Sequence, residues 1–259
     1  MSTELTLRRD YLDQHRRMII GRSIAASLVG MVPVPILEEW LTSAVKRGTI
    51  RRIADAREVD ISADAVRAIA DGPTPPPSWV EMAGTTFVLK LIGRTWRKVL
   101  YAYVVTRRTQ AAARNFVIGT LFDHYCARIH VGLGLDGPTA TELRAIMGAA
   151  IDQTPGGLGE RIFRRATVAA ARATVRAPIE LADIASGGAV RRLLARRDEV
   201  EAAEEVDQAI EAHLSSQEGF LARAATAVEL QLSAESNPYL DDLIGTFEEM
   251  WRARSAGGS

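Results

Sequence analysis

The amino-acid sequence predicts an all-α protein, a multi-helix bundle with a Pro-x-Pro helical hairpin near the N-terminus. Apolar residues recur at intervals of three and four positions in every long segment, which is the spacing of one helix face. Helix-start signals precede several of these segments, among them Ser62 and the capping box formed by Ser78 and Glu81. The strand-like runs, residues 87–89 and 103–105, are short and lie inside helical patterns. We therefore expect helices throughout.

The composition is that of an ordinary globular chain. Of 259 residues, 47% are apolar and 25% are charged, values that exclude a disordered chain and one with many membrane spans. A single cysteine, Cys126, excludes an internal disulfide framework and fits a reducing compartment. Acidic and basic residues are mixed before Met18, whereas a secretory signal peptide has a basic segment followed by an apolar one. We therefore expect a cytoplasmic protein.

Residues 18–31 form an apolar segment that is too short to span a membrane. A helix of these 14 residues would be roughly 21 Å long, whereas the hydrocarbon core of a bilayer is ~30 Å thick. Pro33 and Pro35 then remove backbone donors and push the preceding residues out of helical geometry. Basic residues flank the segment on both sides, which places both ends on the cytoplasmic side of a membrane. The sequence thus predicts a membrane-facing helical hairpin.

We expect this hairpin to insert apolar side chains into the membrane and to contact anionic lipid through its flanking cations. The predicted insertion residues are Ile19, Ile20, Ile24, Leu28, Val32, Pro33, Val34, Pro35, Leu37 and Trp40. The residues predicted to contact the anionic surface are Arg16, Arg17, Lys46, Arg47, Arg51 and Arg52. The alternative is a buried core hairpin with surface arginines at its ends.

The motif Pro33-x-Pro35-x-x-Glu38 is followed by an amphipathic helix that closes on basic residues. This pattern resembles a family of bacterial inner-membrane helical domains of unknown function, which are often found behind Era-like GTPase domains. The resemblance spans residues 18–60 only. It implies a membrane-proximal helical architecture and no catalytic residues.

The zero net charge conceals an uneven distribution of charge. Residues 1–197 carry 29 Lys and Arg against 18 Asp and Glu, whereas residues 198–259 carry 3 against 14. The basic part is therefore expected to bind an anionic partner. The alternative is that the acidic part folds back on the basic part of the same chain. Both hypotheses are compatible if the acidic part competes with the anionic partner for the basic part.

Breaks in the helical pattern predict three regions. They are an N-terminal helical hairpin region (1–71), a central helical bundle (78–187) and an acidic C-terminal helical region (188–259). The proline-rich run at 72–78 is the clearest linker between them. In the central region we expect separate helices at 79–109 and 111–132, and a helix that a capping box of Thr139 and Glu142 opens.

One cluster in the sequence points to chemistry. Asp123, Cys126 and His130 fall at i, i+3 and i+7 on one helix face, and these residue types bind zinc or form nucleophilic sites. An alternative function is therefore a metal- or thiol-dependent enzyme centred on these three residues. However, the sequence has no Cys-x-x-Cys or His-Glu-x-x-His motif and no Gly-Lys-Ser/Thr after the glycines at 156–157. We therefore expect a non-enzyme without a metal or cofactor.

Two further segments suggest partners. The basic run at 94–98 (Arg-Thr-Trp-Arg-Lys) is compatible with a nucleic-acid-binding helical protein. A core helix with a solvated basic edge explains the same run, and we expect no nucleic-acid partner. The last helix has an apolar stripe that predicts either docking on the protein's own core or a groove-binding segment for a partner protein. The predicted partner-binding residues are Tyr239, Leu240, Leu243, Ile244, Phe247 and Trp251.

These patterns together predict a non-enzymatic, peripherally membrane-associated helical protein at the inner face of the cell membrane. It would act through lipid-surface and protein–protein contacts. The expected partners are an anionic membrane surface and another protein, and the pattern leaves homo-oligomerisation open.

Overall fold

A computed structural model provides the three-dimensional structure. It describes residues 10–29, 35–72, 96–132, 134–156, 163, 207–208, 211–212, 220–234 and 238–257. The helices within these ranges are α1 (Asp10–Val29), α2 (Pro35–Ala56), α3 (Ala63–Asp71), α5 (Trp96–Arg128), α6 (Gly137–Gln153), α11 (Phe220–Ala234) and α12 (Pro238–Gly257). The prediction of an all-α, multi-helix bundle is thus confirmed.

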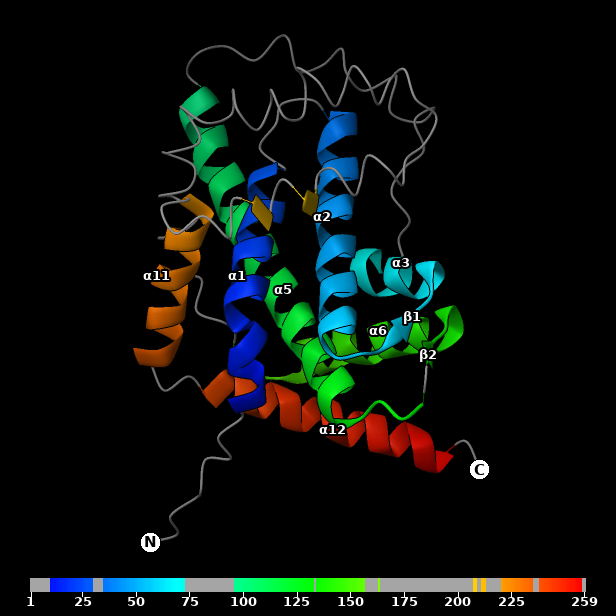
Figure 1. Ribbon diagram of the computed structural model, residues 1–259. Coiled ribbons are helices and arrows are strands. Elements are labelled where there is room, and N and C mark those ends of the chain that lie inside the picture. The colour runs from blue at the N-terminus through cyan, green and yellow to red at the C-terminus, as the bar shows by residue number, and fades with distance from the viewer. Residues whose placement is uncertain are drawn as a thin grey trace, which may run out of the picture.

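The N-terminal hairpin consists of α1 and α2, which lie side by side and run in opposite directions (Figure 1). Helix α2 begins at Pro35, where the missing backbone N–H costs nothing because the first turn of a helix has no intrahelical acceptor for it. The sequence predicts Val34 and Pro35 at the hairpin tip; Val34 lies outside the described residues, and Pro35 is the first residue of α2. The prediction of two antiparallel helices is confirmed.

Helix α5 is one continuous helix of 33 residues, about 50 Å long, and not two helices that meet near residue 110. The predicted break was wrong because the chain has neither glycine nor proline between Trp96 and Phe116, and Ala111, Ala112 and Ala113 are strong helix formers. Helix α5 contacts α1, α2 and α12 (Figure 1). It therefore joins the N-terminal hairpin to the last helix, α12.

A short parallel pairing of β1 (Asp60–Ile61) with β2 (Gly134–Leu135) was not expected from the sequence. It links the α2–α3 connection to the α5–α6 connection, and Ser62 N–H donates to Leu135 O at 3.1 Å. Strands of two residues are too short to leave an alternating pattern in the sequence.

The start of α3 confirms a predicted cap, and the start of α6 corrects one. The Ser62 hydroxyl accepts a hydrogen bond from Ala65 N–H at 3.1 Å, as its N-cap position requires. In α6 the N-cap is Asp136 and not Thr139, because the Asp136 carboxylate accepts from Thr139 N–H at 3.0 Å. Hydrogen bonding from the side chain and the backbone of Thr139 lowers the pKa of the Asp136 carboxyl group.

The core is one hydrophobic cluster that receives residues from all three predicted regions. Ile20 of α1, Phe122 of α5, Leu143 of α6 and Phe247 of α12 are all fully buried in it. Helix α11 packs along α1, and α12 runs across the end of the bundle beside α6 (Figure 1). The boundaries between the regions stay a prediction.

Candidate functional site

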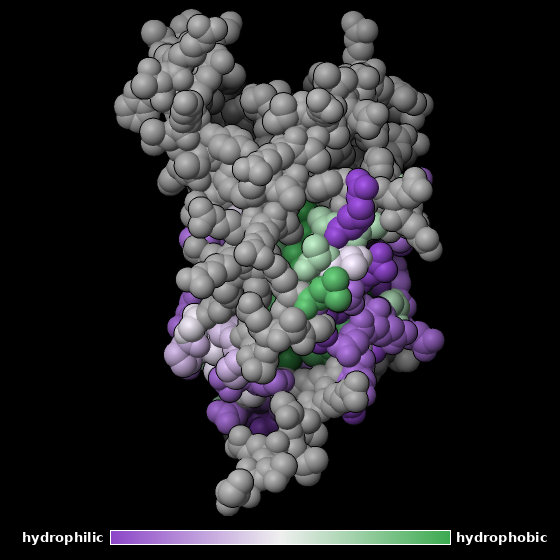
Figure 2. All heavy atoms as spheres, turned by 90° about the vertical axis from the view of Figure 1, so that its left-hand side faces the viewer, coloured by the Kyte–Doolittle hydropathy of each residue, from purple (hydrophilic) through white to green (hydrophobic). Residues whose placement is uncertain are grey.

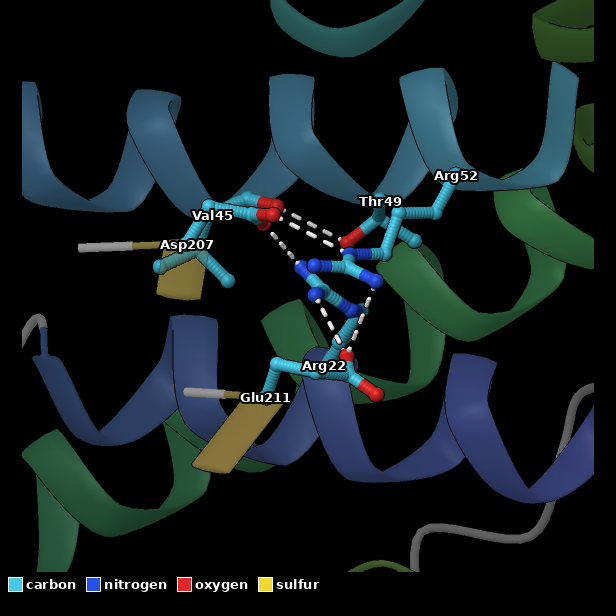
Figure 3. A network of polar contacts seen from close by, with 6 residues as sticks. All are labelled: Arg22, Val45, Thr49, Arg52, Asp207 and Glu211. Carbon is cyan, nitrogen blue, oxygen red and sulfur yellow. Dashed lines mark hydrogen bonds and ion pairs between the residues drawn. The ribbon is translucent and has the colours of Figure 1, made fainter. Parts of the chain in front are cut away.

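A buried arginine lies at the centre of the polar contacts between the basic and acidic parts of the chain. Arg22 on α1 has no exposed surface. Its Nη2 lies 3.0 Å from Glu211 Oε2, and its Nη1 donates to Asp207 Oδ1. Arg52 on α2 pairs with the same two acids, at 3.0 Å to Asp207 and 3.4 Å to Glu211 (Figure 3). We call these four residues the Arg22 network.

The charges in the Arg22 network cancel. Burial of an unpaired guanidinium costs several kcal/mol, and removal of one partner from a buried pair typically costs about 3–5 kcal/mol. Asp207 and Glu211 are four positions apart, which puts both carboxylates on one face of a helical turn. Two acids at this spacing are therefore suited to pair with two arginines that come from neighbouring helices.

Gly48 gives the acidic residues room to approach α2. A Cβ at this position would collide with the Asp207 carboxylate and lie 3.3 Å from Arg22 Nη1. The neighbouring Thr49 hydroxyl donates to Val45 O of its own helix at 2.8 Å (Figure 3). The hydrogen-bond donors of the two arginines thus remain directed at Asp207 and Glu211. The surface of α2 thus has a gap at the point where the carboxylates meet Arg22.

A second polar cluster surrounds Asp123, which is fully buried on α5. Its carboxylate accepts from Arg57 Nε at 2.7 Å and Nη2 at 3.0 Å, and His15 Nδ1 lies at 2.9 Å. Arg57 also donates to Tyr11 O at 2.6 Å. The hydrogen bond to Asp123 raises the pKa of Arg57. Asp123 thus holds α1 and the end of α2 against α5, which is a structural role.

The adjacent His124 connects the same region to α12. The Tyr11 hydroxyl lies 2.6 Å from His124 Nδ1, and His124 Nε2 lies 3.1 Å from Glu248 Oε1. Phe247 packs edge-on to the imidazole with ring centroids 6.2 Å apart. These contacts fix the position of α12 against α5.

The surroundings of Cys126 do not favour thiol chemistry. Burial, and next the charge of Asp123, raise the pKa of this thiol to about 12, whereas Arg57 lowers it. A nucleophilic cysteine needs a lowered pKa. The His130 ring lies beside the Tyr125 ring, with centroids 5.7 Å apart and the planes tilted by 54°. The described residues contain no group of three or more His, Cys, Asp or Glu side chains that could hold a metal ion.

The predicted insertion residues fall into three groups. Ile19, Ile20 and Ile24 are buried in the core, where they cannot contact lipid while the bundle is intact. Trp40 is partly buried and packs against the same core. The side chains of Leu28, Pro35 and Leu37 and the residues Val32, Pro33 and Val34 lie outside what the structure describes. No helix in the described ranges is both long and apolar enough to cross a bilayer.

The predicted lipid-contacting cations are largely engaged within the protein. Arg16 pairs with Asp13 at 2.6 Å, Arg47 with Asp71 at 2.6 Å, and Arg52 belongs to the Arg22 network. Lys46 is partly buried, and that burial lowers its pKa. Lys46 makes no ion pair to the described part of the chain, and neither do the exposed Arg17 and the partly exposed Arg51.

The apolar stripe of α12 packs on the protein's own core. Tyr239, Leu243, Ile244 and Phe247 are buried, and Leu240 and Trp251 are partly buried against the same cluster. This is the docking alternative that the sequence left open. The side chains of the basic run at 94–98 lie outside the described residues.

Comparison with protein-family models, curated proteins and solved structures found no match. The resemblance of residues 18–60 to inner-membrane helical domains therefore stays a prediction. Arg22 was not among the predicted site residues, although it is the only charged residue in the apolar segment 18–31. That isolation was the available signal, because a charge in an apolar stripe needs a buried partner.

Proposed function

We propose that this chain is a non-enzymatic helical protein that acts through protein–protein contacts, and that the α1–α2 hairpin binds an acidic helical segment of its partner. The observation that supports this most directly is the fully buried Arg22, which pairs with two acids far away in the sequence. In this proposal the chain's own acidic segment occupies the binding site until a partner displaces it.

The geometry of the Arg22 network supports an acidic helix as the ligand. Arg22 and Arg52 face one acidic pair with i, i+4 spacing, and Gly48 leaves space for it. The acids come from a part of the chain that carries 14 acidic against 3 basic residues, which favours long-range attraction to the basic body. A partner helix with two carboxylates at the same i, i+4 spacing could form the same ion pairs with Arg22 and Arg52.

The test uses a fluorescent peptide of residues 200–216, added to the full-length chain. In the variant D207N/E211Q the internal ligand keeps its shape but loses both charges, so the peptide can supply the missing carboxylates. An internal segment acts at an effective concentration of the order of millimolar, which suppresses binding in trans. We therefore expect the variant to bind the peptide about tenfold or more tightly than the wild type, or ~1.4 kcal/mol.

The matched control is D242N/E249Q. It removes the same formal charge from two exposed positions of α12. We expect this control to bind the peptide as the wild type does, and binding to D207N/E211Q to weaken as salt rises. Equal affinity for the two double variants, with intact circular dichroism for both, would show that the Arg22 network is not a binding site.

A second candidate function is contact with an anionic membrane surface at the cytoplasmic face. It is supported by the exposed Arg17 and the partly exposed Arg51, which form no ion pair with the residues that the structure describes. On the face shown in Figure 2, hydrophobic residues are visible near the middle, with hydrophilic residues to the right of them.

Liposome co-sedimentation of the full-length chain tests the membrane candidate. Each Lys or Arg near an anionic surface contributes on the order of 1 kcal/mol, so R17Q/R51Q is expected to weaken binding to anionic vesicles by ~2 kcal/mol. D207N/E211Q is expected to strengthen it relative to D242N/E249Q, because Arg22 and Arg52 lose their internal counter-charges. Equal pelleting with neutral and anionic vesicles would rule out the electrostatic contact.

A further inference from the structure

A small cavity lies between α1, α2, α3 and α5, next to the Arg22 network. Its volume is about 20 Å³, and Arg22, Lys46, Thr49 and Asn115 are among the residues that line it. One water molecule needs roughly 10–15 Å³ by this measure. The cavity therefore has room for a single water molecule or a single-atom ion, and it is too small for a phosphate or a metabolite.

Two cationic side chains on this cavity retain unused hydrogen-bond donors. Arg22 places both terminal nitrogens on Asp207 and Glu211, but its buried Nε has no hydrogen-bond partner. Lys46 makes no hydrogen bond or ion pair with any residue that the structure describes. A buried cationic donor without an acceptor is unfavourable, so both groups favour an acceptor in the space between them.

Among the described residues, the acid that acts on Lys46 is already engaged. Asp71 attracts Lys46, but its carboxylate accepts from the Ser43 hydroxyl at 2.7 Å and from Arg47 Nε at 2.8 Å. Burial is the main cause that lowers the pKa of Lys46, and the charges of Arg144 and Arg114 lower it further. Within the described part of the chain, positive charge is therefore in excess on this side of the cavity.

Helix α3 explains why these cations converge. It ends at Asp71, and Arg144 Nε donates to Ile69 O at 3.1 Å. The C-terminal end of a helix carries partial negative charge and attracts cations, but only the equivalent of about half a charge. Among the described residues, one helix end and one paired aspartate do not balance the partly buried Lys46 and Arg144.

We propose that this cavity is a binding site for one small monovalent anion of the size and chemistry of chloride. The anion would accept charge-assisted hydrogen bonds from the Arg22 Nε and the Lys46 ammonium group. It would also reduce the repulsion among the cations at the end of α3. The site does not depend on the proposed partner, because it uses donors that the acidic segment leaves free.

Chlorine NMR of the full-length chain tests the proposal. Chloride that exchanges with a protein site broadens the bulk chloride line, so the wild type is expected to produce excess broadening that bromide competes away. The variant K46M preserves an unbranched side chain but removes the charge, and it is expected to lose most of this broadening. The control R223Q removes one exposed cation on α11 and is expected to keep it.

Crystals of the wild type grown in bromide provide a second measurement, which stands even if K46M fails to fold. We expect an anomalous peak in the cavity within hydrogen-bond distance of Arg22 Nε. Equal broadening in wild type, K46M and R223Q would indicate adventitious surface binding only and would overturn the proposal. A bromide-free cavity that holds an ordinary water peak would overturn it as well.

Discussion

At the residue scale, the interior of this bundle is unusual in the charges that it buries. Arg22 and Asp123 both have no exposed surface, and each pairs with residues that are distant in the sequence. A buried charge is tolerated only where its partners are positioned for it, so these two residues restrict how the helices pack. Cys126 lies one helical turn from Asp123 and shares this environment.

The titration of Cys126 gives a prediction at this scale. Its pKa rises from 9.0 to about 12 on folding, so the folded protein holds the thiol neutral while the unfolded chain ionises above pH 9. The folded state then binds more protons than the unfolded state, and stability falls as pH rises from about 9 to about 12. C126A should lack this loss, which reaches roughly 4 kcal/mol at the alkaline end.

Urea unfolding of wild type and C126A between pH 8 and pH 12 measures the difference. All other groups titrate in both proteins, so the difference between the two stability curves isolates the thiol. The two curves should be parallel below pH 9 and converge or cross above it. Curves that stay parallel to pH 12 would mean that the thiol is not protected by burial.

At the scale of elements, two glycines set how closely neighbouring segments approach. Gly48 admits the acidic residues to α2, and Gly119 lets α5 approach α1. A Cβ on Gly119 would lie 2.8 Å from Ile19 Cγ2, and Ile19 is itself buried. The contact between these helices therefore depends on the absence of one methyl group.

Gly119→Ala is expected to destabilise the protein by about 1–3 kcal/mol, because the core must shift to accept the extra atom. The matched control is Gly245→Ala on α12, where a new Cβ would meet nothing within 4 Å. The control should gain ~0.5–1 kcal/mol from the better helix propensity of alanine. Chemical denaturation measures both, and a gain in stability in both variants would contradict the close approach of α1 and α5.

At the scale of the whole molecule, the acidic part of the chain is a structural component of the bundle. Residues 220–234 and 238–257 form α11 and α12, whose Val228, Ile244 and Phe247 are buried in the common core. The acidic part also contributes Asp207 and Glu211 to the Arg22 network. The acidic part thus binds the basic part of the chain in two ways, through ion pairs and through apolar packing in the core.

Truncation after residue 197 is therefore expected to abolish cooperative folding. The fragment 1–197 should bind a hydrophobic dye and lose near-UV circular dichroism while it keeps much of its helix signal. Addition of a 198–259 fragment should restore the cooperative transition, because it supplies the missing apolar surface. If the fragment 1–197 unfolds cooperatively without the added fragment, α11 and α12 are not part of the core.

The sequence by itself determined the local features of this fold. Helical spacing, the Ser62 cap, the proline at the start of α2 and the stripe of α12 all follow from residues within a few positions of each other. The uneven charge also predicted that the acidic part could fold back on the basic part. Two local features were predicted wrongly or missed. The sequence predicted a break within α5, which is continuous, and it gave no sign of the two-residue strands.

Only the tertiary structure decided which apolar faces are core and which acids meet which arginines. The predicted insertion residues Ile19, Ile20 and Ile24 proved to be core residues, a distinction that periodicity cannot make because lipid and protein interior favour the same side chains. Arg22 and Glu211 lie 189 positions apart, and their pairing depends on how α1, α2 and the acidic segment pack together. Such contacts leave no local pattern, because the free energy that selects them comes from burial in the assembled bundle.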